Sequence, residues 1–167
     1  MHSRSQLLAD VPAELREDLE TRIDIIEHKL KYVTDKPSIA IVESLDPLKL
    51  ATVDEELLGL AGGTAIKAED ASLWNDLKTI DPEILIFAIK GNSIPQTLSA
   101  VFEKVPMELL GELFAMKSNR VFIAESENFY NVSGEKLVDH LELVAEIINP
   151  KQFYFGFEGN GWVKLSI

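Results

Sequence analysis

The sequence has 167 residues, of which 16 are basic and 28 acidic, so its net charge is −12. This length corresponds to one domain, and a hydrophobic content of 46% is typical of a globular chain and excludes general disorder. A nucleic-acid-binding protein needs a basic surface to displace counterions from phosphates, so the acidic balance argues against a nucleic-acid partner. The absence of cysteine excludes disulfides, thiolate metal sites and a thiol nucleophile.

Membrane and export signals are not evident in the sequence. No apolar run approaches the ~20 residues that a helix needs to span a bilayer. Residues 1–17 contain no apolar stretch of the length found in signal peptides. We therefore expect that any export signal lies upstream of the sequence as written.

The N-terminal part predicts a long amphipathic helix. Between Pro12 and Val33, apolar residues recur every three or four positions, which places them on one helical face. Pro12 suits the first turn of such a helix, and Pro37 follows its end. The apolar stripe consists of Leu15, Leu19, Ile23, Ile26, Leu30 and Val33.

Three short apolar runs, residues 39–42, 84–89 and 121–124, predict buried strands. They do not alternate with polar residues, so both faces of each strand should be covered, as in a parallel sheet between helices. Helical patterns lie between and after them, at residues 53–60, 72–80, 95–104, 106–117 and 137–148. The prediction is a three-layer α/β lobe whose short, mainly parallel sheet is flanked by helices.

The last residues predict a C-terminal β-hairpin. Two β-rich runs, 153–158 and 162–167, flank the turn sequence Gly159-Asn160-Gly161. We expect this hairpin to pack its aromatic side chains, Phe155, Phe157 and Trp162, onto the body of the lobe.

Ligands of open parallel sheets bind beyond the carboxyl ends of the strands. Here those positions carry carboxylates, amides, hydroxyls, a glycine and two aromatic rings, a mixture suited to a mid-sized polar solute. No nucleophile elbow, phosphate-binding glycine loop or paired metal-binding histidines are present. His2, His28 and His140 are expected at a terminus or on helix surfaces away from the strand ends. The chain is therefore predicted not to be an enzyme. The alternative left open is a metal-dependent enzyme using Glu43, Asp46, Glu125 and Glu127.

Three segments resemble, in order, the substrate-binding proteins of cobalamin and iron-siderophore ABC importers. The first is IAIVESLDPLKLATVDEELLGLAGG, a strand, a loop and a helix ending in paired glycines. The second is SLWNDLKTIDPEILIFAIKGN, in which a Trp-bearing helix meets a strand that ends near glycine. The third is RVFIAESENFYNVSGEKLVDHLELVAEIINP, with a strand, an aromatic loop and a final helix. Together they cover about residues 37–150.

The resemblance implies two α/β lobes joined by one rigid helix, with the solute held between the lobes. It assigns residues 1–36 to the interlobe helix, 37–150 to the C-terminal solute-binding lobe and 151–167 to the hairpin appendage. No segment of this sequence corresponds to the N-terminal lobe. The implied partners are a small solute, an ABC permease and either that lobe or a second copy of the chain, at the periplasm or outer face of the membrane.

Carried over position by position, the resemblance implies a corrinoid or ferric-chelate ligand rather than a resident cofactor. It also implies that Glu103 docks on the permease through basic residues. The alternative is a stand-alone, homodimerising interaction domain without solute, in which the apolar stripe of the long helix is covered by a second chain. If the chain binds a solute, the resemblance implies that the contacts come from Glu43, Ser44, Asp46, Gly91, Asn92, Asn128, Phe129 and Tyr130.

Overall fold

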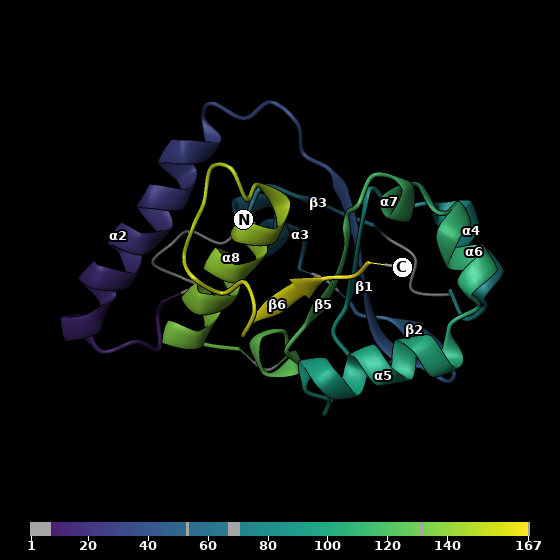
Figure 1. Ribbon diagram of the computed structural model, residues 1–167. Coiled ribbons are helices and arrows are strands. Elements are labelled where there is room, and N and C mark those ends of the chain that lie inside the picture. The colour runs from purple at the N-terminus through teal and green to yellow at the C-terminus, as the bar shows by residue number, and fades with distance from the viewer. Residues whose placement is uncertain (1–7, 53, 67–70, 131, 167) are drawn as a thin grey trace.

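The computed structural model describes residues 8–52, 54–66, 71–130 and 132–166 (Figure 1). Its helices and strands, in chain order, are α2 (Ala13–Leu30), β1 (Ser38–Leu45), β2 (Leu48–Leu50), α3 (Glu55–Leu60), β3 (Thr64–Ala65), α4 (Trp74–Ile80), β4 (Ile84–Phe87), α5 (Ile94–Lys104), α6 (Met107–Glu112), α7 (Phe114–Lys117), β5 (Val121–Ala124), the 3-10 helix η1 (Ser126–Asn128), α8 (Glu135–Ile148) and β6 (Trp162–Lys164).

The strands form one mainly parallel sheet in the order β2-β1-β4-β5-β6, with β3 beside the start of β1. The three predicted strands, β1, β4 and β5, are parallel neighbours at its centre. Every residue of β4 and β5 is buried, which explains why their sequences do not alternate. The shorter β2 and β6 pair antiparallel at the two edges. The predicted parallel sheet is thereby confirmed.

Helices cover both faces of the sheet (Figure 1). Ile41 and Ile86 belong to the core on the side of α3 and α8, whereas Val42 and Phe87 belong to the core on the side of α4 to α7. Alternate residues of each strand therefore anchor opposite helical layers. The predicted three-layer arrangement is confirmed, with α2 as an additional outer layer against α8.

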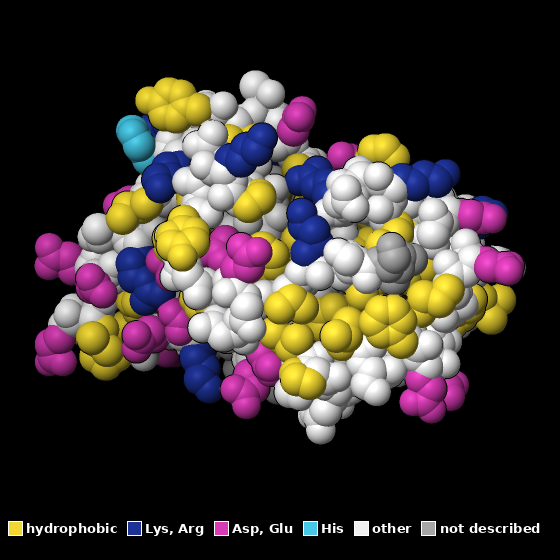
Figure 2. Space-filling model, viewed as in Figure 1, with side chains coloured by type: hydrophobic (Ala, Val, Ile, Leu, Met, Phe, Trp, Pro, Cys, Tyr) yellow, Lys and Arg dark blue, Asp and Glu magenta, His cyan; other side chains and the backbone are white. Residues whose placement is uncertain are grey.

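The long helix α2 packs its apolar stripe on α8. Leu19, Ile23 and Ile26 are at most 3% exposed. The expectation that this stripe needs cover from another lobe or chain is therefore wrong for these three residues, because α8 covers them. Leu15 remains 49% exposed. The outer side of α2 is acidic, and Figure 2 shows its carboxylates at the edge of the molecule.

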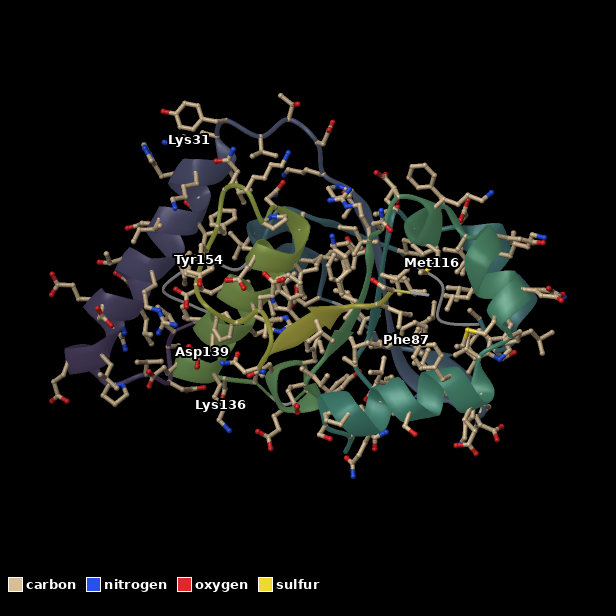
Figure 3. The ribbon with its side chains drawn as sticks, in the orientation of Figure 1. Lys31, Phe87, Met116, Lys136, Asp139 and Tyr154 are labelled. Atoms are coloured by element: carbon tan, nitrogen blue, oxygen red, sulfur yellow. The ribbon has the colours of Figure 1, made fainter. Side chains whose placement is uncertain are left out.

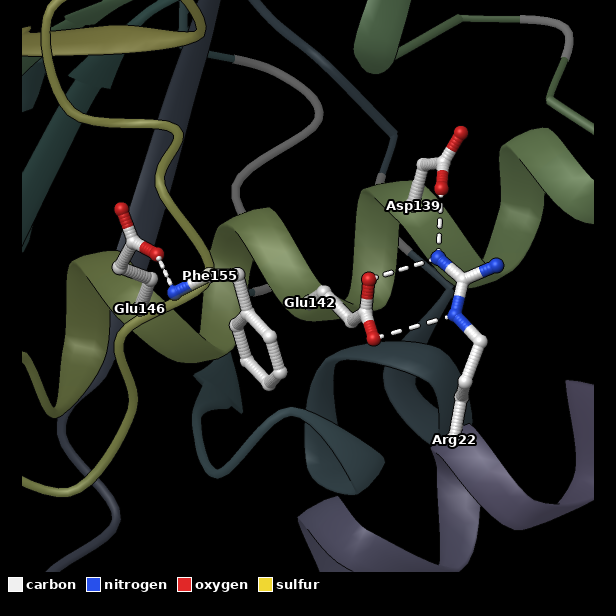
Figure 4. Close-up of polar contacts among 5 residues, drawn as sticks. All are labelled: Arg22, Asp139, Glu142, Glu146 and Phe155. Atoms are coloured by element: carbon white, nitrogen blue, oxygen red, sulfur yellow. Dashed lines mark hydrogen bonds and ion pairs between the residues drawn. The ribbon is translucent and has the colours of Figure 1, made fainter.

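The C-terminal segment departs from the predicted hairpin. The second half forms β6, but β6 pairs with β5 (Ile123 opposite Val163), and residues 153–158 form no strand. The turn before β6 is present, with a φ of 98° at Gly159, a value that glycine adopts without strain. Residues 153–158, which include the Tyr154 labelled in Figure 3, instead cross α8. There the carboxylate of Glu146 accepts a hydrogen bond from the backbone N–H of Phe155 (Figure 4).

The expected packing of the terminal aromatic residues is confirmed. Trp162 is 3% exposed and meets Phe122 edge to face, with ring centroids 5.4 Å apart. Phe155 and Phe157 lie half-buried against the same core. Among the described residues, no helix combines the length and apolarity that crossing a membrane requires.

Candidate functional site

The carboxyl ends of β1, β4 and β5 meet at one edge of the sheet, as the sequence predicts. The backbone N–H of Lys90, after β4, donates to the carbonyl of Glu43 in β1 at 3.1 Å. The hydroxyl of Ser126, after β5, donates to the carbonyl of Asn92 at 3.1 Å. We call this region the strand-end edge.

Glu43 lies within β1 rather than in a loop, and it is only 8% exposed. Its carboxylate pairs with Lys90 Nζ at 2.8 Å and Lys49 Nζ at 3.4 Å. Burial raises the pKa of Glu43, but the hydrogen bonds and charges of Lys90 and Lys49 outweigh it and hold the pKa below its ordinary value. Both lysines are largely exposed, so the edge presents two ammonium groups held in place by one buried carboxylate.

Tyr130 closes the edge from the loop that follows η1. Its hydroxyl donates to the carbonyl of Ala88, directly after β4, and Lys90 Nζ lies 5.0 Å from the centre of its ring. Burial and then the charge of Glu43 raise the pKa of Tyr130, so the phenol stays protonated at neutral pH. Glu43, Lys90 and Tyr130 thus form one connected group.

The other predicted contacts lie around this group. Ser44 is opposite Lys49 in the ladder between β1 and β2, and Asp46 is exposed in the turn that joins those strands. Gly91 has a φ of 83° and open space where a side chain would start. Asn92 is half-buried and supplies the carbonyl already described.

His140 contradicts the expectation of a surface position away from the strand ends. Its Nδ1 bonds the carbonyl of Asn128, and its ring meets Phe129 edge to face at 5.0 Å. Burial lowers the pKa of His140, and the hydrogen bond to Asn128 offsets this only in part. The sequence carried a signal for this position, since residue 140 shares the helical face of Leu137 and Val144.

A cavity of about 150 Å³ opens beside the strand-end edge, between α3, α8 and the loop after η1. We call it the aromatic-loop cavity. Its walls include Leu57, Phe129, Tyr130 and His140, and Asp54 stands exposed at its rim.

The alternative of a cation site at the strand ends is not supported. Glu43 is paired with two lysines, and Glu125 Oε1 accepts from the backbone N–H of Ile94 at 2.9 Å. Over residues 8–52, 54–66, 71–130 and 132–166, no three His, Cys, Asp or Glu residues cluster as metal ligands.

No protein-family model matches the sequence, and no curated protein matches it significantly. Solved structures do share its fold. An ABC transporter substrate-binding protein from Listeria monocytogenes is 20% identical, with a TM-score of 0.64 over 80% of this chain and 55% of its own. A periplasmic heme-binding protein from Pseudomonas aeruginosa is 17% identical, with a TM-score of 0.67 over 92% of this chain and 56% of its own.

An ABC-type Fe3+-hydroxamate transport protein from Saccharomonospora viridis is similar at 20% identity, with a TM-score of 0.60 over 81% of this chain and 48% of its own. The chain thus spans about half the length of the solved structures that it matches. Its fold is that of part of an ABC-transporter substrate-binding protein, which confirms the resemblance at the level of fold.

Proposed function

We propose that this chain captures a small metal chelate for an ABC importer, as one lobe of a clamp that closes on the solute. The observation that carries the proposal is the connected group of Glu43, Lys90 and Tyr130 at the strand-end edge of this fold. Ligands of open α/β sheets bind at such an edge. The function is binding without catalysis, in an extracytoplasmic compartment.

The chemistry of the edge favours a flat or rounded solute with anionic groups on its rim. Phe129 and Tyr130 offer half-buried aromatic surface, and Lys49 and Lys90 offer exposed ammonium groups in a chain of net charge −12. Ser44, Asn92 and Asn128 would hydrogen-bond the rim. A ferric chelate, a heme or a corrinoid has this combination of size and polar periphery.

The test is a titration of the purified chain with three probes: hemin, the ferric hydroxamate ferrichrome and cyanocobalamin. Absorbance changes and calorimetry report binding. We expect one probe to bind saturably with one-to-one stoichiometry, and more weakly than it would bind a complete two-lobed protein. Absence of saturable binding for all three would overturn the proposal.

Docking on the permease is the second part of the proposal. Glu103 is exposed near the end of α5 and is available to basic residues of a permease. Because such contacts are electrostatic, they weaken as salt rises. Glu103→Arg should reduce association with the permease and leave solute affinity unchanged, whereas Glu108→Arg, an exposed carboxylate on α6, serves as the matched control. Equal losses for both variants would remove Glu103 from this role.

The alternative of a homodimerising domain rested on an uncovered stripe along α2. Burial of Leu19, Ile23 and Ile26 against α8 removes half of that six-residue stripe from the surface, which leaves less apolar area for a second chain to cover.

A further inference from the structure

The imidazole of His140 offers a lone pair beside the aromatic-loop cavity. A carbonyl oxygen can only accept a hydrogen bond, so the Nδ1 that bonds the carbonyl of Asn128 carries the ring proton. In the neutral ring this leaves Nε2 as an acceptor. Nε2 makes no hydrogen bond to the described residues. It is also not one of their fully buried side-chain nitrogen or oxygen atoms that lack a hydrogen-bond partner. An acceptor nitrogen is therefore available on a wall of the cavity.

Asp54 supplies a second acceptor at the rim of the cavity. Its Oδ1 caps α3 by accepting from the backbone N–H of Glu56 at 2.9 Å and of Leu57 at 3.3 Å. Within the described part of the chain, Oδ2 makes no contact of this kind. The carboxylate can therefore serve a ligand without giving up its capping bonds.

Apart from Thr52, the rest of the wall is apolar or aromatic, contributed by Ile41, Ala51, Leu57, Leu58, Phe129, Tyr130 and Val132. The ammonium group of Lys90 pairs with Glu43 at 2.8 Å and lies 5.0 Å from the centre of the Tyr130 ring. A cavity of about 150 Å³ holds a molecule of roughly the size of benzene. These walls match a short alkyl arm whose polar end donates hydrogen bonds and carries positive charge, since the Asp54 carboxylate and the His140 nitrogen both accept.

We propose that the aromatic-loop cavity binds a primary alkylammonium arm, with the ammonium group donating to His140 Nε2 and Asp54 Oδ2. The inference rests on the proposed function only in identifying the arm as part of the captured solute. The cavity itself is tested without any chelate.

The probe is n-butylammonium chloride, titrated into the intact chain at constant ionic strength. The ¹⁵N chemical shift of His140 Nε2 reports on the acceptor directly. We expect a saturable shift with n-butylammonium and none with sodium butyrate, which has the same number of carbon atoms and the opposite charge. A linear, non-saturating response to n-butylammonium, or an equal response to butyrate, would overturn the proposal.

The charge requirement is tested at Asp54, since replacing the packed His140 would also disturb the loop after η1. Asparagine caps helices well, so Asp54→Asn keeps the cap of α3 and removes only the charge. We expect n-butylammonium to bind about fivefold more weakly to this variant than to the wild type.

The matched control is Asp76→Asn on α4, where Asp76 Oδ2 accepts from the backbone N–H groups of Ser72 and Leu73 on the other side of the sheet. Unchanged affinity for Asp54→Asn, or equal losses for both variants, would contradict the role of Asp54. Chelate binding without the ammonium response would retain the proposed function and remove only this subsite.

Discussion

The indole Nε1 of Trp162 donates a hydrogen bond to Glu146 Oε1 at 3.0 Å, between α8 and the start of β6. The same oxygen accepts from the backbone N–H of Phe157 at 3.1 Å and of Glu158 at 3.0 Å, while Oε2 accepts from Phe155 (Figure 4). Glu146 is only 2% exposed. The fold tolerates this buried carboxylate because the N–H donors surround it. One carboxylate on α8 thus fixes the path of the C-terminal segment.

Glu146→Gln should destabilise the chain by about 1–3 kcal/mol, because the amide NH₂ would face a backbone N–H in place of a charged acceptor. Urea unfolding followed by tryptophan fluorescence measures the loss, and the near-ultraviolet circular dichroism of Trp162 should change with it. Glu135→Gln, an exposed position in the first turn of α8, is the control and should have little effect. Equal stabilities of the two variants would refute the role of Glu146.

Arg22 of α2 forms ion pairs with two carboxylates of α8. Its guanidinium bonds Glu142 through Nε at 3.1 Å and Nη2 at 2.6 Å, and Asp139 through Nη2 at 2.6 Å (Figure 4). These hydrogen bonds, that to Glu142 foremost, raise the pKa of Arg22 further, so the guanidinium stays ionised. Arg22→Met should cost about 2 kcal/mol in unfolding free energy, since it leaves the largely buried Glu142 without its partner.

The control for Arg22 is the ion pair between Lys78 and Glu112, in which both side chains are 55% exposed. Lys78→Met should leave the urea midpoint nearly unchanged, because exposed ion pairs contribute little. A larger loss at Lys78 than at Arg22 would contradict this account of how α2 is held.

His140 should make stability depend on pH below its ordinary pKa of 6.5. Burial lowers the pKa of His140 in the folded chain, so between that lowered value and 6.5 the unfolded chain binds more protons. The contribution of this group to stability is therefore complete above pH 6.5 and decreases as pH falls toward the folded pKa.

Urea midpoints measured from pH 7.5 to 5 should show this slope for the wild type, and the slope should be absent from His140→Gln. His28→Gln, at an exposed position of α2, should retain the slope. A slope that survives the replacement of His140 would assign it to another group.

Glu43 makes the stability of the chain depend on pH in a lower range. Its folded pKa lies below the ordinary 4.5 because its bonds to Lys90 and Lys49 outweigh burial, so its contribution is present above 4.5 and is lost as pH falls through the folded pKa. Glu43→Gln should reduce stability by about 1 kcal/mol at pH 7, a modest figure because both lysines are exposed. The difference between variant and wild type, followed by urea unfolding, should shrink toward pH 3. A difference that stays constant with pH would show that the ion pairs are not its source.

Sequence patterns predicted the central strands and the helical layers, because a strand that is buried on both faces is a short apolar run without polar alternation. They failed for residues 153–158, whose β-rich composition is the same whether the segment pairs with β6 or wraps around Glu146. That carboxylate lies one turn after Glu142 on α8, where nothing in the local pattern identifies its distant donors. At the site, the sequence located the three strand-end segments. It missed the pairing of Glu43 with two lysines and the contact of His140 with Phe129, because both join residues far apart in the chain.

If the aromatic loop after β5 captures the solute, Tyr130 should contribute directly to the affinity. The measurement is the dissociation constant of whichever chelate binds the wild type, taken from absorbance titrations of Tyr130→Ala and of Tyr154→Ala, whose side chain is 84% exposed on the segment that crosses α8. We predict affinity about tenfold weaker for Tyr130→Ala, with an unchanged far-ultraviolet circular dichroism spectrum, and wild-type affinity for Tyr154→Ala. Wild-type affinity in Tyr130→Ala would contradict the account.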